Sequence, residues 1–409
     1  MKRWIGLSVW FAAILCGLLV QDWKLQQAQQ PDDPEYRLVI CTGWAGIDVS
    51  QRMIAAREMY RRQHPDHAVE LLVTAKNMDA FIASGSHGAD LVYANTNTVQ
   101  RPELYEDLSA YPQIMQPLSA HWIASGAMKD AQGRIVCLPD RASLATFSSL
   151  LFARDADALA QIGLYLPEGG VSYDAFRALA QQAKDAGRIF LAMDKYARHI
   201  PDAYAALYPD AQGFDTAEFR EILAFWKEMQ DSGFVVFADN VDLSGALMTC
   251  SCGSVMDTGK HSIDLRPAAI LNGDTLYFPS ENGSDAVYIP AWAWYMPADG
   301  AQKQLAAEML AYLASPEVQT RLEDGGTGMM LTDMTKYRNW RRWTWQQVRG
   351  YTVFPGLNAQ GYPRWAALLE DIVQPAWQQD ERAAFSALAP QYFAGEISLD
   401  ELLAQLSTP

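Results

Sequence analysis

Over residues 289–296 two sets of side chains alternate with a period of two: Ile289, Ala291, Ala293 and Tyr295 on one side, and Pro290, Trp292, Trp294 and Met296 on the other. This period predicts a β-strand whose two faces meet different surroundings. Asp299 follows in a short turn, and we expect it to cap a helix that carries leucine and methionine at helical spacing. Ser315 and Pro316 then predict a second helix, with Ser315 as its cap and Pro316 in its first turn.

The chain from residue 38 to residue 98 shows three apolar runs of strand length, separated by two segments of helical pattern. This order of strand, helix, strand, helix and strand predicts a parallel, doubly wound α/β sheet. The strands are expected over residues 38–42, 69–74 and 89–94, and the helices over residues 49–63 and 78–83.

Aromatic and polar residues follow the predicted strands of this sheet. Ligands of doubly wound sheets bind beyond the carboxyl ends of the strands, so Trp44 and Asn95 are expected at the mouth of a binding site. A second interpretation of Trp44 is a loop residue that covers its own lobe. No glycine-rich nucleotide-binding motif accompanies the strands, which argues against a nucleotide cofactor.

Two helices in the second half of the chain have strong sequence signals. Asp215 and Glu218 resemble a capping box. The apolar stripe over residues 219–229 then predicts a helix that packs against a core. Ser398 and Glu401 form a second capping box, which predicts where the last helix begins.

The overall composition fits two globular domains. The 409 residues are half apolar and one fifth charged, which predicts packed cores and not disorder. The net charge is −16 and no basic stripe is visible, which excludes nucleic acid as a partner. The 13 tryptophans supply faces that can stack on sugars, although most of them are expected in the core.

The first 35 residues are predicted to be an export segment followed by a tether. Two basic residues precede an apolar run over residues 4–20, which as a helix spans about 25 Å, the short limit for crossing a membrane. The run predicts a signal peptide or anchor with its positive end inside, and the polar segment after it a tether. Cleavage, a lipid on Cys16 and retention as an anchor are the three alternatives.

The five cysteines show no disulfide framework. Cys41 and Cys137 fall inside predicted strands and are expected to be buried as small apolar residues. Cys250 and Cys252 are too close in sequence for an unstrained disulfide, so we interpret them as structural thiols whose redox state stays open. His261 is the only histidine near them, and no metal site is expected.

Several segments together resemble the extracellular solute-binding proteins of ABC importers, in the sugar-binding group. Residues 128–139 contain a polar turn, a predicted strand over residues 134–138 and Pro139, which ends it, as in the first crossing between the lobes of that family. Residues 246–259 resemble the family's ligand-facing strand and loop, and residues 288–314 resemble its return crossing.

The resemblance implies a two-lobed α/β fold of the periplasmic-binding-protein type, with two doubly wound sheets joined by three hinge crossings. The N-terminal lobe is expected to comprise residues 36–143 and 288–325, and the C-terminal lobe residues 144–287 and 326–409. The third crossing is expected over residues 327–333. The lobes of such a protein close on the ligand by hinge bending.

The resemblance further implies an extracytoplasmic protein that captures a carbohydrate, with an oligosaccharide favoured, for the membrane permease subunits of an ABC transporter. We expect a monomer that its N-terminal segment holds at the outer face of the cytoplasmic membrane, without cofactor, metal ion or catalytic residues. The residues expected to contact the ligand are Trp44, Asn95, Asp140, Arg141, Ser143, Asp194, Tyr196, Asp257, Trp292 and Tyr362.

Trp292 is the strongest of these candidates because it follows the expected hinge at Pro290. Its alternative is a tryptophan packed inside the sheet, which is the interpretation favoured for Trp294. Two other functions stay open: a membrane-anchored sensor domain of the same fold, and a carbohydrate-active enzyme. No supported catalytic motif is present, but Asp and Glu are numerous enough for a glycosidase pair.

Overall fold

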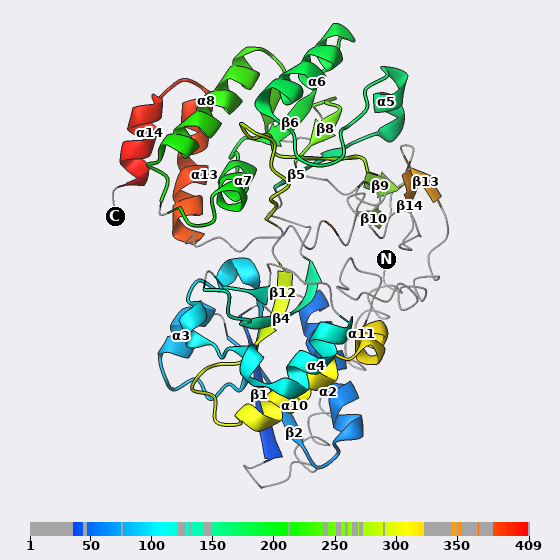
Figure 1. Ribbon diagram of the computed structural model, residues 1–409, viewed down its shortest axis with the longest axis vertical. Coiled ribbons are helices and arrows are strands. Elements are labelled where there is room, and N and C mark those ends of the chain that lie inside the picture. The colour runs from blue at the N-terminus through cyan, green and yellow to red at the C-terminus, as the bar shows by residue number, and fades with distance from the viewer. Residues whose placement is uncertain are drawn as a thin grey trace, which may run out of the picture.

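The protein is described by a computed structural model, and the residues that it describes form two lobes, each built on a five-stranded sheet (Figure 1). No helix of the described residues has the length and apolar character needed to cross a membrane. The export segment predicted over residues 1–35 lies outside the described residues. The structure describes residues 36–43, 47–74, 77–121, 128–130, 132–142, 149–211, 213–239, 244–250, 255–257, 261–263, 269, 273–288, 291–322, 346–348, 351–353, 367 and 379–407.

The first sheet has the strand order β2-β1-β3-β12-β4. β1 is parallel to β2 and β3, as the sequence predicts, whereas β12 runs antiparallel to both β3 and β4. The chain therefore leaves this sheet after β4 and returns to it through β12. The strands are β1 (Arg37–Thr42), β2 (Ala68–Val73), β3 (Leu91–Asn95), β4 (Cys137–Ala142) and β12 (Ala291–Tyr295).

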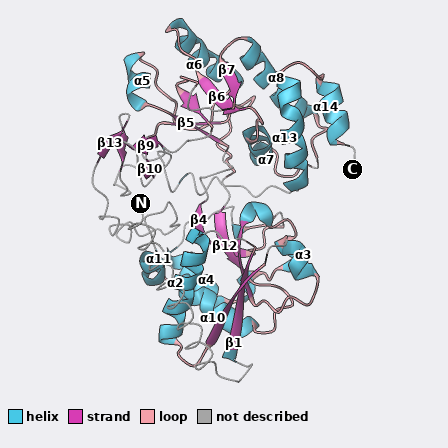
Figure 2. Ribbon diagram, turned by 180° about the vertical axis from the view of Figure 1, so that it is seen from behind, coloured by secondary structure: helices cyan, strands magenta, loops and turns pink. Residues whose placement is uncertain are grey.

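Helices cover both faces of the first sheet, as a doubly wound sheet requires. α3 lies on one side of the sheet, and α2, α4 and α10 lie together on the other (Figure 2). The helices of this lobe are α2 (Ile47–Gln63), α3 (Met78–Ala83), α4 (Pro112–His121), α10 (Lys303–Leu313) and α11 (Pro316–Leu322), with 3-10 turns over Thr96–Thr98, Pro102–Leu104 and Leu108–Ala110.

Strand β4 differs from its prediction. It was expected to end at Pro139, but Pro139 lies inside it, opposite Ala293 of β12. β4 is an edge strand, so the missing N–H of a proline need not interrupt the ladder, and the register shifts between Trp292 and Ala293. Cys41 of β1 and Cys137 of β4 are both buried free thiols, as predicted.

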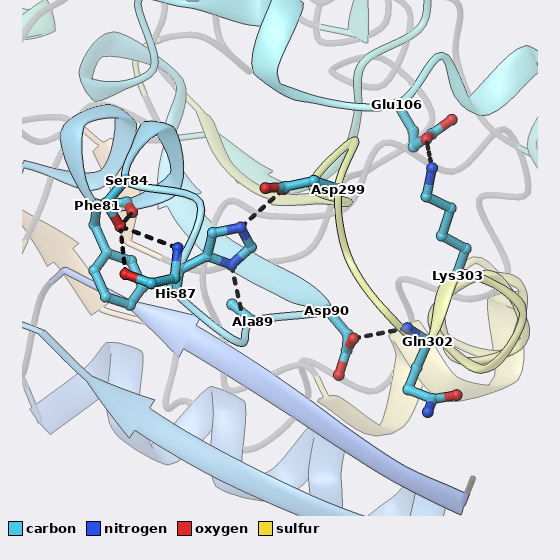
Figure 3. Close-up of polar contacts among 10 residues, drawn as sticks. Phe81, Ser84, His87, Ala89, Asp90, Glu106, Asp299, Gln302 and Lys303 are labelled. Carbon is cyan, nitrogen blue, oxygen red and sulfur yellow. Dashed lines mark hydrogen bonds and ion pairs between the residues drawn. The ribbon is translucent and has the colours of Figure 1, made fainter. Parts of the chain in front are cut away.

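The start of α10 also differs from its prediction. Asp299 does not cap this helix, which begins at Lys303 after an N-cap residue, Gln302, that makes no side-chain cap bond. His87 instead donates from Nε2 to Asp299 at 2.8 Å, because its Nδ1 accepts from the Ala89 N–H (Figure 3). Asp299 therefore ties the turn before α10 to the turn before β3. The predicted cap of α11 by Ser315 is confirmed.

Buried Asp90 holds the same two turns together. Its Oδ1 accepts from the Gln302 N–H at 2.9 Å (Figure 3). Its Oδ2 accepts from the Val39 N–H, also at 2.9 Å. The side chain thus joins β1, the entry of β3 and the start of α10. Burial raises the pKa of this carboxyl group, and the backbone donors act in the opposite direction.

The second sheet has the strand order β11-β5-β8-β6-β7 and is mixed: β6 is parallel to β7 and β8, and β5 is antiparallel to β8 and β11. α8, α13 and α14 lie together beside it (Figure 1). The elements are β5 (Leu150–Ala153), α5 (Ala156–Gln161), α6 (Tyr173–Asp185), β6 (Leu191–Asp194), α7 (His199–Leu207), α8 (Ala217–Asp231), β7 (Val235–Ala238), β8 (Met248–Thr249), β11 (Thr275–Tyr277), α13 (Gln379–Phe393) and α14 (Leu399–Leu406), with paired strands β9 (Val255–Asp257) and β10 (His261–Ile263), and β13 (Gln346–Val348) and β14 (Tyr351–Val353).

The core of the second lobe follows the predicted helical stripe of α8. The large apolar residues of this stripe are buried, with Trp226 fully enclosed: Phe219, Ile222, Leu223, Phe225, Trp226 and Met229. The cap of α8 is Thr216, which accepts from the Phe219 N–H at 3.1 Å, so the expected Asp215 box is off by one residue. The box of Ser398 is confirmed at the start of α14.

Two crossing segments run side by side between the lobes. The Tyr288 N–H donates to Ser149 Oγ at 2.8 Å, and the Ser149 N–H donates to the Tyr288 carbonyl at 3.2 Å. Ser149 precedes β5 and Tyr288 precedes β12, so the outgoing and returning chains are paired. The third crossing, predicted over residues 327–333, lies outside the described residues.

The Asp90 contacts generate a stability prediction. Replacing Asp90 by Ala leaves the N–H groups of Val39 and Gln302 without their acceptor. A donor that is left unsatisfied in the protein interior lowers the stability by about 1–3 kcal/mol. We expect Asp90→Ala to lower the free energy of unfolding by roughly 2–4 kcal/mol in urea titrations. The control, Asp299→Asn, keeps an oxygen acceptor for the buried His87 and should cost less than about 1 kcal/mol. Equal losses in the two variants would contradict this role of Asp90.

Candidate functional site

Three residues predicted to contact a ligand lie side by side in the first sheet. In the ladder, Trp292 of β12 stands opposite Asn95, the last residue of β3, and opposite Arg141 of β4. This row lies where β4 leaves for the second lobe and β12 returns from it (Figure 1). Asn95 is buried and Trp292 is half-buried, and the side chain of Arg141 lies outside the description.

Trp292 ends a row of stacked aromatic rings. Its ring centroid lies 5.5 Å from that of Tyr93, with an interplanar angle of 29°. Tyr93 lies 4.4 Å from Trp294, which is fully buried, as expected. Trp292 is the member of this row that keeps some exposure. Its ring is therefore held in place by the two enclosed rings behind it.

Asp140, expected to face a ligand, lies inside the first lobe. Its carboxylate is fully buried and forms a two-point ion pair with Arg52 of α2, in which Arg52 Nη2 donates to Oδ1 at 2.7 Å and Nε donates to Oδ2. Tyr93 donates its hydroxyl to Oδ2 at 2.7 Å, and Gln319 of α11 donates to Oδ1 at 3.4 Å. These contacts engage both oxygens with protein groups, so we interpret Asp140 as a structural residue.

Four other predicted contacts cannot be compared with described side chains. Trp44, Ser143 and Tyr362 lie outside the described residues. Asp257 ends strand β9, which pairs with β10, but its side chain is not described. These four residues stay predictions.

In the second lobe, predicted Asp194 and Tyr196 lie at the carboxyl end of β6. Asp194 Oδ1 accepts from the Tyr196 N–H at 3.0 Å and from Arg198 Nε at 3.3 Å. The ring of Tyr196 is 41% exposed, with the Lys195 ammonium 5.1 Å and the Arg198 guanidinium 5.4 Å from its centroid. Tyr196 is thus an exposed ring beside two cations, on a different sheet from Trp292.

A buried polar cluster that the sequence analysis missed lies next to Asp194. His199 begins α7, Asp202 follows one turn later, and Cys250 follows β8. All three are buried, and Asp202 is paired with Arg382 of α13 at 2.9 Å. Arg382 also lies 4.7 Å from the centre of the Tyr288 ring, at the return crossing. A sequence signal existed: Asp194 was already a candidate ligand contact, and Cys250 lies in the segment of residues 246–259 that resembles a ligand-facing strand and loop.

Charge within this cluster controls the protonation of His199. Burial by itself lowers the pKa of this imidazole, but Cys250, Asp202 and Asp194 outweigh it and raise the pKa to about 9. Burial raises the pKa of the Asp202 carboxyl, while Arg382 and His199 act in the opposite direction. The cluster therefore attracts positive charge.

The Arg52–Asp140 pair generates a second prediction. Removing one partner of a buried ion pair typically costs about 3–5 kcal/mol, because the other charge is left uncompensated. We expect Asp140→Ala to lose stability in this range, measured by urea unfolding. The double variant Arg52→Met/Asp140→Leu, which removes both charges, should lose less. A double variant as unstable as the sum of both single variants would contradict this account.

Comparison with known proteins adds information on the fold. No protein family model matches the chain, and no curated protein matches its sequence. Solved structures do match over nearly their whole length. A cyclic α-maltosyl-1,6-maltose binding protein from Arthrobacter globiformis is 15% identical, with a TM-score of 0.59 over 90% of this chain and 96% of that one.

Two further structures give the same result. The sugar-binding protein MalE from Xanthomonas citri is 13% identical, with a TM-score of 0.61 over 90% of this chain and 95% of its own. An ABC transporter solute-binding protein from Thermotoga lettingae, bound with α-D-tagatose, is 14% identical, with a TM-score of 0.54 over 91% and 97%. The chain therefore has the two-lobed α/β fold of periplasmic binding proteins, as its sequence predicts.

Proposed function

We propose that the chain is the extracytoplasmic substrate-binding component of an ABC transporter, which captures a carbohydrate between its lobes and closes around it by hinge bending. The row of Asn95, Trp292 and Arg141 beside the crossings carries this proposal. An aromatic face suits the apolar CH surface of a sugar ring, and amide and guanidinium groups suit its hydroxyls.

The solved structures support the same class of ligand. The proteins named above are a maltosyl-maltose binding protein, a sugar-binding protein and a tagatose-bound solute-binding protein, and a further match, AcbH, has a stated preference for β-D-galactopyranose. These proteins bind ligands and are not described as enzymes. Binding and release require no catalytic group, which agrees with our proposal that this chain is not an enzyme.

The finer parts of the proposal concern the ligand's size and the protein's partners. We favour an oligosaccharide, because Trp292 on one sheet and Tyr196 on the other offer two separate aromatic rings. The partners would be membrane permease subunits, which read the closed state that the sugar stabilises. Residues 1–35 would hold a monomeric protein at the outer face of the cytoplasmic membrane.

A thermal-shift screen of the full-length protein against mono- and oligosaccharides tests the proposal. A sugar at about 100 times its Kd should stabilise the protein by roughly 2.7 kcal/mol, which is seen as a rise in Tm. The same mixtures are analysed for products by chromatography. A rise with one class of intact sugar supports a binding protein, turnover would replace it by an enzyme, and no rise with any sugar would reject carbohydrate as the ligand.

Trp292→Ala tests the aromatic row directly. The change removes the half-buried ring at the end of the row, so we expect the affinity for the sugar found in the screen to fall at least tenfold, about 1.4 kcal/mol, in calorimetric titrations. Tyr165→Ala is the control, since Tyr165 is 81% exposed in the second lobe and should leave affinity unchanged. Unaltered affinity in a folded Trp292→Ala protein, checked by circular dichroism, would remove Trp292 from the site.

A further inference from the structure

Three side chains with different metal-binding atoms converge at the carboxyl end of the second sheet. One ligand atom each of Asp194, His199 and Cys250 lies within 4.8 Å of the others. The side chains of His199 and Asp194 are 6% and 14% exposed, and Cys250 is 2% exposed. Imidazole, carboxylate and thiolate are all groups that coordinate Zn²⁺, and His199 and Cys250 already form a side-chain hydrogen bond with each other.

The carboxylate of Asp194 is oriented for such a role. Its Oδ1 is occupied by the Tyr196 N–H and by Arg198 Nε, at 3.0 and 3.3 Å. Its Oδ2 lies 3.8 Å from His199 Nε2, which is longer than a hydrogen bond. One oxygen is therefore fixed by surrounding donors while the other faces the imidazole, the arrangement typical of a carboxylate whose outer contacts orient it toward a metal ion.

Each of the three residues is held by regular structure. Asp194 ends β6, and Cys250 follows β8, the parallel neighbour of β6, with its Sγ 4.0 Å from the Ala192 carbonyl oxygen. His199 is the first residue of α7, and Ala197, with a φ of +49°, makes the sharp turn that brings it back toward β6. Groups on rigid elements form sites with defined geometry.

A second observation lies in the same cluster. Asp202, one turn after His199 in α7, is fully buried, and neither of its carboxylate oxygens accepts a hydrogen bond among the described residues. It has an ion pair with Arg382 at 2.9 Å. Arg382 pairs with Asp202, so the positive charges nearest Asp194 are the His199 imidazole when it is protonated and the partly exposed Arg198. A divalent cation bound at the cluster would take the place of the His199 proton.

We propose that Asp194, His199 and Cys250 form a site for a divalent metal ion of the zinc class, with the fourth position open to water or an oxygen of a bound solute. Imidazole, carboxylate and thiolate together favour Zn²⁺ over the oxygen-seeking Mg²⁺ and Ca²⁺. Tetrahedral Zn²⁺ places its ligand atoms about 3.3–3.7 Å apart, so the three groups need to approach one another by about 1 Å. Metal binding is measured without any carbohydrate present, so the two proposals can fail separately.

Cobalt titration of the full-length protein, stripped of metal by a chelator, tests the site at about pH 8, where fewer protons compete for the ligands. One equivalent of Co²⁺ should produce a thiolate-to-cobalt charge-transfer band and the intense visible bands of tetrahedral Co²⁺, and Zn²⁺ should displace it. Cys250→Ser should abolish the charge-transfer band, and Asp194→Asn or His199→Gln should weaken binding at least tenfold. The control is Cys137→Ala, a buried thiol in the other lobe, which should keep both.

Equilibrium dialysis of the unaltered protein against Zn²⁺ provides a test without any substitution, in case a variant does not fold. A ratio near one bound zinc ion per chain supports the site, and no bound zinc would overturn it. A charge-transfer band that persists in folded Cys250→Ser protein would also overturn it, because the thiolate would then come from another cysteine.

Discussion

The buried ion pair between Arg52 and Asp140 is the interaction on which the first lobe depends. It joins α2 to the edge strand β4, and Arg52 also donates to the Leu322 carbonyl at 2.6 Å, at the end of α11. Two charges withdrawn from water are stable only while each compensates the other. The pair therefore fixes β4, and with it the point where the chain leaves for the second lobe.

The same pair supports the candidate site. Tyr93 donates to Asp140 through its hydroxyl and stacks on both Trp292 and Trp294 through its ring. A ligand that stacks on Trp292 would thus contact a ring that is supported by Tyr93, which the buried Arg52–Asp140 pair holds in place. Rigid support of this kind lowers the entropy lost on binding. The second lobe has a parallel arrangement, since Arg382 contacts both Tyr288 at the crossing and Asp202 beside His199.

Local sequence signals predicted most of the elements, and where they failed the reason is tertiary. The alternation over residues 289–296 correctly indicated β12, but Pro139 appeared to end β4 because its tolerance depends on β4 lying at the sheet edge. Asp299 had the right residue type and position for a cap, yet His87, 212 residues away in sequence, takes its carboxylate. A competing partner so far away in the sequence cannot be inferred from the residues around Asp299.

The two-lobed fold was implied by the resemblance of the chain to a known family. By itself, the sequence determined the periodicities, the capping box at Ser398 and the buried stripe of α8. Such features depend on neighbours within a few residues, which the chain brings together as soon as a helix or strand forms. Only the tertiary structure decided that Asp140 is buried beneath the site, that Trp292 keeps exposure while Trp294 loses it, and that Cys250 meets His199. Those outcomes depend on contacts between residues about 50 or more positions apart, which packing creates and no local pattern encodes.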